Sequence, residues 1–120
     1  MILVDTSVWI DHLRKTNPQL VQLLSKALVL THPFIIGELA CGNLHKRTQF
    51  LMLMENLPTS KEASNQEVLY FIEHNQLMGR GIGYIDTHLL ASTALTAETK
   101  IWTYDKKLKK PAYDLGLALQ

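Results

Sequence analysis

The fold is decided by the stretch Ile2-Leu3-Val4-Asp5-Thr6-Ser7, in which a short apolar run meets a carboxylate and two hydroxyls. The apolar residues are typical of a buried strand. Thr6 or Ser7 is a favourable N-cap for the helical pattern that continues to about Lys15. In open parallel sheets, ligands bind just beyond the carboxyl ends of the strands. The stretch therefore predicts a strand, a turn and a helix, with Asp5 placed where a functional site is expected.

The rest of the chain alternates between strand-like and helix-like patterns. We expect further strands at residues 28–31 and 100–104, with small ones at 57–59 and 115–119. Helices are expected at residues 19–28, 33–42, 44–54, 65–77 and 86–98, with one turn at 106–110 before Pro111. Parallel strands need crossover connections, which these helices supply. The pattern predicts an α/β fold, a single domain over residues 1–120 whose mostly parallel central sheet is covered by helices on both faces.

Composition narrows the class of protein. The chain has 120 residues, 47% of them hydrophobic, which suffices for one core. The formal charge of +1 excludes a protein that coats nucleic acid through net charge alone. The single cysteine, Cys41, cannot form an internal disulfide, and the first residues do not resemble a secretory signal. No apolar run approaches the roughly 18 to 20 residues that cross a bilayer. We therefore expect a cytoplasmic protein without a membrane role.

Four acidic residues stand in apolar surroundings. Asp5 and Asp105 each follow an expected strand, so they should emerge from the same edge of the sheet. Glu38 lies inside an apolar helical pattern, and Asp86 follows Tyr84-Ile85. Ionised groups are rarely left unpaired in such surroundings. The joint pattern predicts one shared metal site.

Three of these acids have simpler interpretations when taken alone. Asp5 fits an ordinary turn acid, Asp86 fits a helix N-cap, and Asp105 fits a solvated charge pair with the lysines that follow. Glu38 lies too far past any cap for such an explanation. Converging carboxylates repel one another unless a cation neutralises them, and oxygen ligands favour Mg²⁺ or Mn²⁺ over zinc. Such an ion suits phosphodiester hydrolysis.

Four stretches together resemble the PIN domain and, within it, the VapC-type ribonuclease toxins of bacterial toxin–antitoxin pairs. They are Ile2-Leu3-Val4-Asp5-Thr6-Ser7, Gly37-Glu38-Leu39-Ala40-Cys41-Gly42, Ile85-Asp86-Thr87-His88-Leu89-Leu90-Ala91-Ser92 and Trp102-Thr103-Tyr104-Asp105-Lys106-Lys107-Leu108. The resemblance implies that the four acids form a catalytic quartet that binds Mg²⁺ or Mn²⁺. It also implies that Thr6, Ser7 and Thr103 orient ligands or water.

The resemblance further implies a metal-dependent endoribonuclease toxin of a type II pair that hydrolyses tRNA or another structured RNA. A cognate antitoxin would neutralise it, and the toxin would be a homodimer. Arg80, Lys106 and Lys107 are candidate contacts to the RNA backbone. Two alternatives stay open: a PIN-like RNA-binding or RNA-processing domain outside a toxin pair, and a Mg²⁺-binding receiver-like signalling domain. The second would need an adjacent acidic pair after the first strand, where Asp5 stands alone.

Overall fold

The computed structural model describes residues 1–120 and has a three-stranded sheet at its centre. β1 (Ile2–Val4) lies between β2 (Val29–Leu30) and β3 (Lys100–Trp102), and both neighbours run parallel to it. Leu3 pairs with a residue of each neighbour, so β1 has no free edge. The expectation of a mostly parallel sheet is confirmed, and all three strands are parallel.

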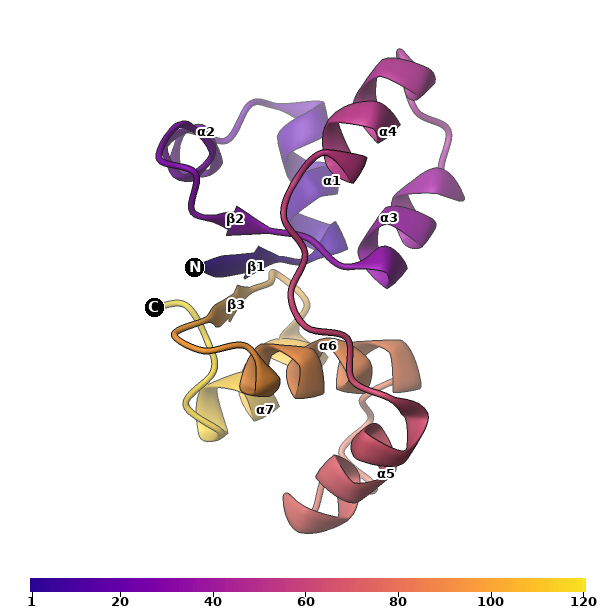
Figure 1. The fold of residues 1–120 in the computed structure, drawn as a ribbon, viewed down its shortest axis with the longest axis vertical. Helices are drawn as coiled ribbons and strands as arrows, with labels where there is room; N and C mark the ends of the chain where they lie inside the picture. Colours follow the sequence, from indigo (N-terminus) through magenta and orange to yellow (C-terminus); the bar gives the residue numbers. More distant parts are fainter.

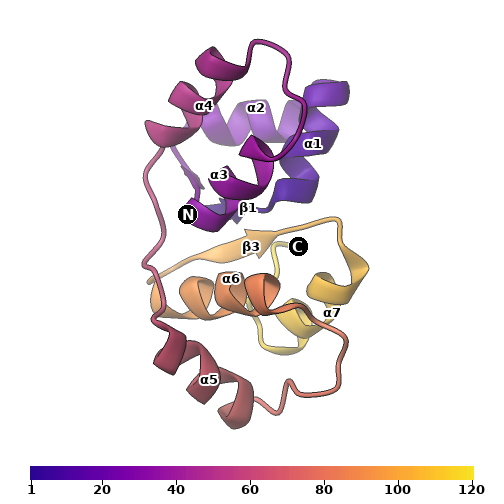
Figure 2. The same cartoon turned by 90° about the vertical axis from the view of Figure 1, so that its right-hand side faces the viewer.

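Seven helices surround the sheet. They are α1 (Thr6–Arg14), α2 (Pro18–Ser25), α3 (Pro33–Ala40), α4 (Arg47–Glu55), α5 (Asn65–His74), α6 (Tyr84–Leu95) and α7 (Lys106–Asp114). In Figure 1, α1 to α4 lie on one side of the strands and α5 to α7 on the other, and Figure 2 shows the same division from the side. Helices therefore cover both faces, as expected. The longest helix has 12 residues, and none is long and apolar enough to span a membrane.

One apolar cluster joins the sheet to both groups of helices. It contains Leu3 and Val4 of β1, and it includes Leu89 of α6. Trp9 and Trp102 are also buried in it. Burial of a large apolar side chain stabilises a fold by about 1.5–3 kcal/mol. The carboxyl ends of β1 and β3 are thus anchored in the apolar core.

The last helix is longer than the single turn expected before Pro111. α7 continues through that proline to Asp114, although proline offers no N–H for the helical hydrogen bond to Lys107. Pro111 is buried with its neighbour Ala112 and with Leu108, and this packing offsets the lost hydrogen bond. The expectation of an earlier helix end was therefore wrong.

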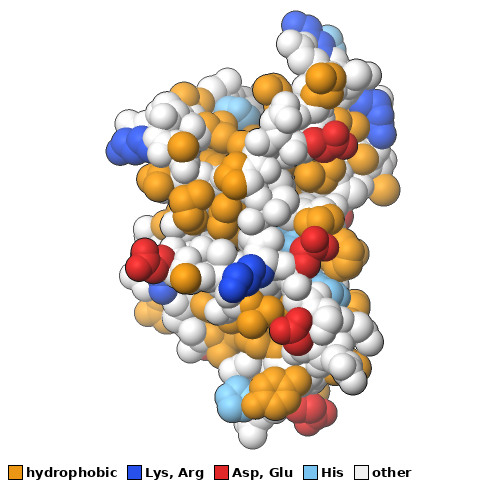
Figure 3. Space-filling view, viewed as in Figure 1, with side chains coloured by type: hydrophobic (Ala, Val, Ile, Leu, Met, Phe, Trp, Pro, Cys, Tyr) orange, Lys and Arg blue, Asp and Glu red, His pale blue; other side chains and the backbone are white.

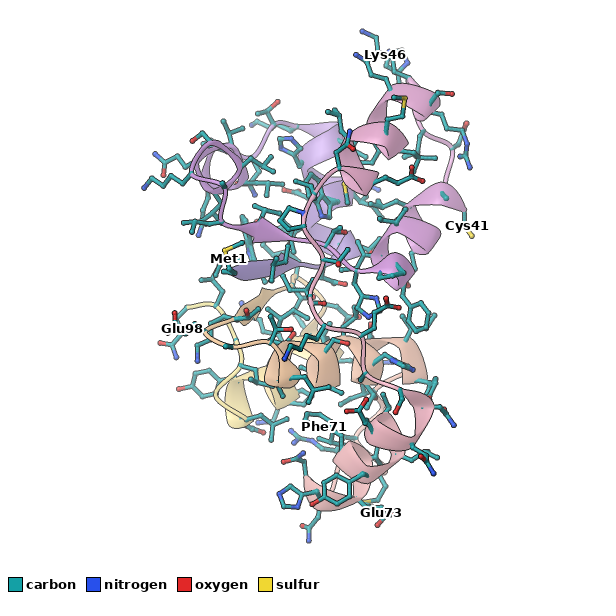
Figure 4. All side chains as sticks on the ribbon, in the orientation of Figure 1. Met1, Cys41, Lys46, Phe71, Glu73 and Glu98 are labelled. Carbon is teal, nitrogen blue, oxygen red and sulfur yellow. The ribbon has the colours of Figure 1, made fainter.

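Other boundaries shift by a few residues. α4 begins at Arg47 and not near residue 44, because Lys46 adopts a left-handed conformation with φ of 50°. The small strands expected at 57–59 and 115–119 are reduced to single bridges, Thr31 to Thr59 and Ile101 to Ala118. The two termini lie on the same side of the molecule (Figure 1). There the amino group of Met1 donates to the carbonyl of Glu98 at 2.9 Å, and Figure 4 shows these two residues as neighbours.

Candidate active site

Asp5 lies at the carboxyl end of β1, as the sequence predicted, and its side chain is buried. Its backbone N–H donates to the carbonyl of Trp102 at 2.9 Å, which joins it to the end of β3. Two hydroxyls donate to the same carboxylate oxygen, Oδ2: Ser7 at 2.8 Å and Thr103 at 2.7 Å. A buried carboxylate is stabilised by such donors. Ser7 and Thr103 therefore hold Asp5 in one orientation.

The two hydroxyls are themselves fixed by backbone groups. The Ser7 hydroxyl oxygen accepts from the N–H of Tyr104 at 3.0 Å, and the Thr103 hydroxyl oxygen accepts from the N–H of Asp105 at 3.0 Å. Each hydroxyl has one hydrogen, and Asp5 receives both. The second oxygen of Asp5, Oδ1, has no hydrogen-bond partner in the protein. This oxygen is available to a ligand.

Glu38 is positioned by a different hydroxyl. The Oγ1 atom of Thr6, in the first turn of α1, donates to Oε1 of Glu38 at 2.7 Å. Glu38 is exposed on α3, so this bond links the first helix to the third across the edge of the site. All three small polar residues named from the sequence therefore contact an acid of the quartet.

Asp105 caps the last helix. Its Oδ1 atom accepts from the N–H of Lys107 at 2.9 Å, in the usual N-cap geometry. The simpler interpretation of Asp105 as a charge pair with the lysines that follow it is wrong, since Asp105 forms no ion pair. Asp105 thus has a structural function in addition to its place beside the other acids.

Asp86 does not cap its helix. Gly83 occupies the N-cap position of α6, and its carbonyl accepts from both the N–H and the hydroxyl of Thr87 at 3.0 Å. Asp86 lies in the first turn without a hydrogen bond to its side chain, so the N-cap interpretation was wrong. Burial, as the largest cause, and then the charges of Asp5, Asp105 and Glu38 together raise the pKa of Asp86 to about 6. The charges of the other three acids therefore act on Asp86.

The donor chemistry of this site fits a hard divalent cation. No group of three or more histidine, cysteine or acidic side chains is placed to hold an ion directly. Mg²⁺ commonly binds through one or two carboxylates and keeps several waters. Two carboxylates could serve as such ligands. Asp5 has an oxygen without a hydrogen bond, and Asp86 has a raised pKa, so a cation beside it would stabilise its charged form. Direct binding of one ion by all four acids stays a prediction.

The three candidate RNA contacts differ in their surroundings. Lys106 and Lys107 are exposed in the first turn of α7, directly after Asp105. Arg80 instead forms an ion pair with Asp114 at 2.7 Å, and this contact lowers the pKa of that carboxyl. A phosphate would have to compete with Asp114 for Arg80, whereas the two lysines are unpaired.

Two histidines, His32 at the start of α3 and His88 in α6, are buried. His32 caps α3, because its Nδ1 accepts from the N–H of Phe34 at 3.0 Å. Its Nε2 lies 3.3 Å from the hydroxyl of Ser92 on α6. Burial lowers the pKa of His32 and of His88, so both are neutral at pH 7. They tie α3 to α6 without adding charge.

A groove of about 630 Å³ opens beside the acids and was missed from the sequence. Its apolar lining comes mainly from α1, α3 and α4, and Glu38 also lines it. The sequence did contain a signal for the groove. Its apolar residues stand three apart on each helix, as Ile10 and Leu13 on α1 and as Phe50 and Leu53 on α4. Arg14, His45 and Lys46 also line it, and Figure 4 shows Lys46 at the outer tip of the molecule near α4.

Comparison with known proteins gives two results. The PIN domain family matches residues 2–113. Ribonuclease VapC32 of Mycobacterium tuberculosis, from strain CDC 1551 / Oshkosh and from strain ATCC 25618 / H37Rv, is 44% identical over 119 residues. The similarity covers 99% of this chain and 96% of each relative. The resemblance noted from the four sequence stretches is thereby confirmed.

Proposed function

Because the chain belongs to the PIN-domain family, we propose that it is a cytoplasmic endoribonuclease toxin of the VapC type that depends on Mg²⁺ or Mn²⁺. The single observation that carries this proposal is the electrostatic coupling of Asp86 to the other three acids. A fold gains nothing from a half-buried carboxylate that lacks a hydrogen bond and is repelled by three others. Such an arrangement is typical of a functional site.

Asp5 and Asp86 would hold the ion, with Glu38 and Asp105 beside them. A bound Mg²⁺ or Mn²⁺ would neutralise the acids, polarise the scissile phosphate and promote attack by water. The protein's own contribution is orientation. Ser7 and Thr103 keep the free oxygen of Asp5 turned to the site, and Thr6 holds Glu38 at its edge.

The proposed substrate is tRNA or another structured RNA. Lys106 and Lys107 lie at the acidic site and are free to contact phosphates on either side of the cut bond. Contacts of this kind position the strand without reading its sequence. Arg80 would join them only after it leaves Asp114.

The proposed partner is an antitoxin whose apolar helical segment fills the groove between α1, α3 and α4. The groove has an apolar lining, and Glu38 of the quartet is one of its lining residues, so an occupant would contact one of the four acids. Helix-in-groove binding needs apolar anchors at helical spacing, which Ile10, Leu13 and Leu53 are placed to receive. Arg14 and Lys46 at the rim favour an acidic flank on the partner. We also propose a homodimer, by analogy with the VapC type.

Cleavage of a fluorescently labelled tRNA transcript tests the activity. We expect cleavage with millimolar Mn²⁺ and none with excess EDTA. Asp11→Asn, which changes an exposed acid of α1 outside the site, is the matched control and should cleave normally. An activity that survives EDTA, or no cleavage of any RNA offered, would contradict the proposal.

Expression in a bacterial host tests the toxin assignment separately. The protein alone should arrest growth, and co-expression of a cognate antitoxin should restore growth and yield a stable complex. Nuclease activity without growth arrest would favour the alternative of an RNA-processing domain outside a toxin pair. The receiver-like alternative has no support, because the family match covers nearly the whole chain.

A further inference from the structure

Three aromatic rings form a row where the N-terminal ends of α3 and α6 meet. The ring centroids of Phe34 and His88 are 4.8 Å apart with an interplanar angle of 75°, and those of Tyr84 and His88 are 4.9 Å apart at 87°. These are favourable edge-to-face contacts. His88 is only 7% exposed, whereas Phe34 is 37% and Tyr84 44% exposed. The histidine thus supports two rings that remain open to solvent.

Both outer rings are held in place. The backbone N–H of Phe34 donates to His32 at 3.0 Å, and the His32 ring also packs against the Phe34 ring, with centroids 5.1 Å apart. The Tyr84 hydroxyl donates to the side-chain oxygen of Asn65, at the start of α5. A ligand that binds these rings has little further ordering to impose.

The row lies beside the acidic site. Phe34 precedes Glu38 by four residues, so the two side chains lie on the same face of α3, one turn apart. Tyr84 and His88 are four residues apart and share one face of α6, whereas Asp86, two residues from each, points to another face. The pair of Phe34 and Glu38 on α3 therefore carries the connection between the row and the acids. In Figure 3, hydrophobic and histidine side chains adjoin one another on the right-hand edge, between the levels of α3 and α6 in Figure 1.

We infer that Phe34 and Tyr84 form a stacking platform for a nucleobase adjacent to the phosphodiester bond that is cut. The inference deepens the proposed function and rests on it. Exposed aromatic faces beside a phosphate-binding site suit a single-stranded or unpaired nucleotide, which carries a ring and a phosphate together. Stacking of this kind tolerates any base, so the platform would position the strand without specifying its sequence.

A protein occupant is less well matched to this patch. A second copy that docked here by two-fold symmetry would bring two sets of four acids towards each other. Like charges placed opposite each other across an interface oppose association. The observations therefore favour a nucleobase, and a contact between copies becomes an outcome that the experiment detects.

Fluorescence of the Phe34→Trp variant tests the platform directly. The native tryptophans, Trp9 and Trp102, are buried and give a steady background. Octauridylate and an abasic ribose-phosphate octamer would be titrated with and without Mn²⁺. We expect octauridylate to quench the added signal at concentrations at which the abasic octamer does not. Equal quenching by the two octamers, or none by either, would overturn the inference.

Cleavage kinetics supply the second readout. Phe34→Ala and Tyr84→Ala should each lower kcat/KM about tenfold on octauridylate and leave cleavage unchanged when the nucleotides beside the cut bond are abasic. Phe34→Tyr and Tyr84→Phe keep the rings and should cleave normally. Tyr70→Ala is the matched control, because Tyr70 is 67% exposed and also lies against a histidine, His74.

The outcomes separate the platform from the proposed activity. Equal losses on both substrates, with a changed sedimentation coefficient for the alanine variants, would identify a contact between copies and overturn the platform. A wild-type protein that cleaves neither octamer and also leaves the labelled tRNA transcript intact would contradict the proposed nuclease. Base-dependent quenching in that protein would still support Phe34 and Tyr84 as a nucleobase site.

Discussion

Asp5 and Asp86 belong to the same acidic site, yet the protein holds them in opposite ways. Asp5 is buried at the end of β1 and accepts two hydroxyl hydrogen bonds, so its charge is compensated by the fold. Asp86 stands in the first turn of α6 without a hydrogen bond, and Gly83 caps the helix in its place. Burial and the other three acids raise the pKa of Asp86 to about 6.

The difference shows which acid the fold needs. Removal of Asp5 would leave the hydroxyls of Ser7 and Thr103 without their acceptor, so its loss affects structure and chemistry together. Asp86 destabilises the fold whenever it is charged. A side chain that costs stability and makes no structural contact is the stronger indicator of function. Variants that separate chemistry from stability should therefore distinguish the two acids.

The largest expected effect is on RNA cleavage. Asp5→Asn and Asp86→Asn should each lower the cleavage rate by roughly 100-fold or more, because each removes a charge from the proposed metal site. The double variant should be little slower than either single one, since residues that act as a unit are not additive. Rates would be measured with saturating Mn²⁺ on the labelled transcript. Near-normal cleavage by Asp86→Asn would contradict the proposed role of Asp86 in metal binding.

Metal binding should raise the stability of the native protein. An ion that binds only the folded state stabilises it by about 2.7 kcal/mol at a hundredfold excess over Kd, which is a Tm increase of several degrees for a domain of this size. Thermal unfolding with EDTA and with millimolar Mn²⁺ measures the shift. Asp86→Asn should retain only a small part of it. The same shift in both proteins would remove Asp86 from the metal site.

The hydroxyls of Ser7 and Thr103 should stabilise the fold through their hydrogen bonds to Asp5. Thr103→Val removes a donor to buried Asp5 and the acceptor for the N–H of Asp105, so we expect a loss of about 1–3 kcal/mol in urea unfolding. Thr103→Ser keeps the hydroxyl and is the control. A valine variant as stable as the serine variant would mean that Asp5 does not depend on this network.

The smallest expected effect is on how the stability of the protein depends on pH through Asp86. Since the folded-state pKa of Asp86 lies above the usual aspartate value of 3.8, the cost of its charge is absent below about pH 4. That cost grows as pH rises towards 6 and is complete above it. In EDTA, Asp86→Asn should therefore have the Tm of the wild type near pH 4 and a higher Tm above pH 6. A Tm difference that does not change with pH would contradict this assignment.

The sequence predicted the scaffold well where local signals were strong. Asp5 follows its strand as expected, and α5 starts at residue 65 as predicted, behind a capping box formed by Ser64 and Glu67. The resemblance also placed three hydroxyl residues beside the acids, and the structure gives each an acid as partner. Short-range patterns therefore sufficed for most of the fold and for the composition of the site.

The remaining features depend on contacts between distant residues. Asp86 and Asp105 both stand at the start of a helical pattern, so the sequence could not decide which of them caps a helix. In the structure only Asp105 is an N-cap residue. Pro111 reads locally as a helix end, yet its burial in the core keeps α7 intact. The row of Phe34, His88 and Tyr84 unites two helices far apart in the chain, so no local spacing reveals it.

The most direct test of the shared acidic site is the pKa of Asp86 itself. Carboxyl carbon NMR of the metal-free protein would follow its titration, with the Asp86→Asn spectrum used for assignment. We expect a midpoint near 6, and a lower midpoint in Glu38→Gln because one repelling charge is gone. A midpoint near 3.8 that Glu38→Gln leaves unchanged would show that the acids do not form one coupled site.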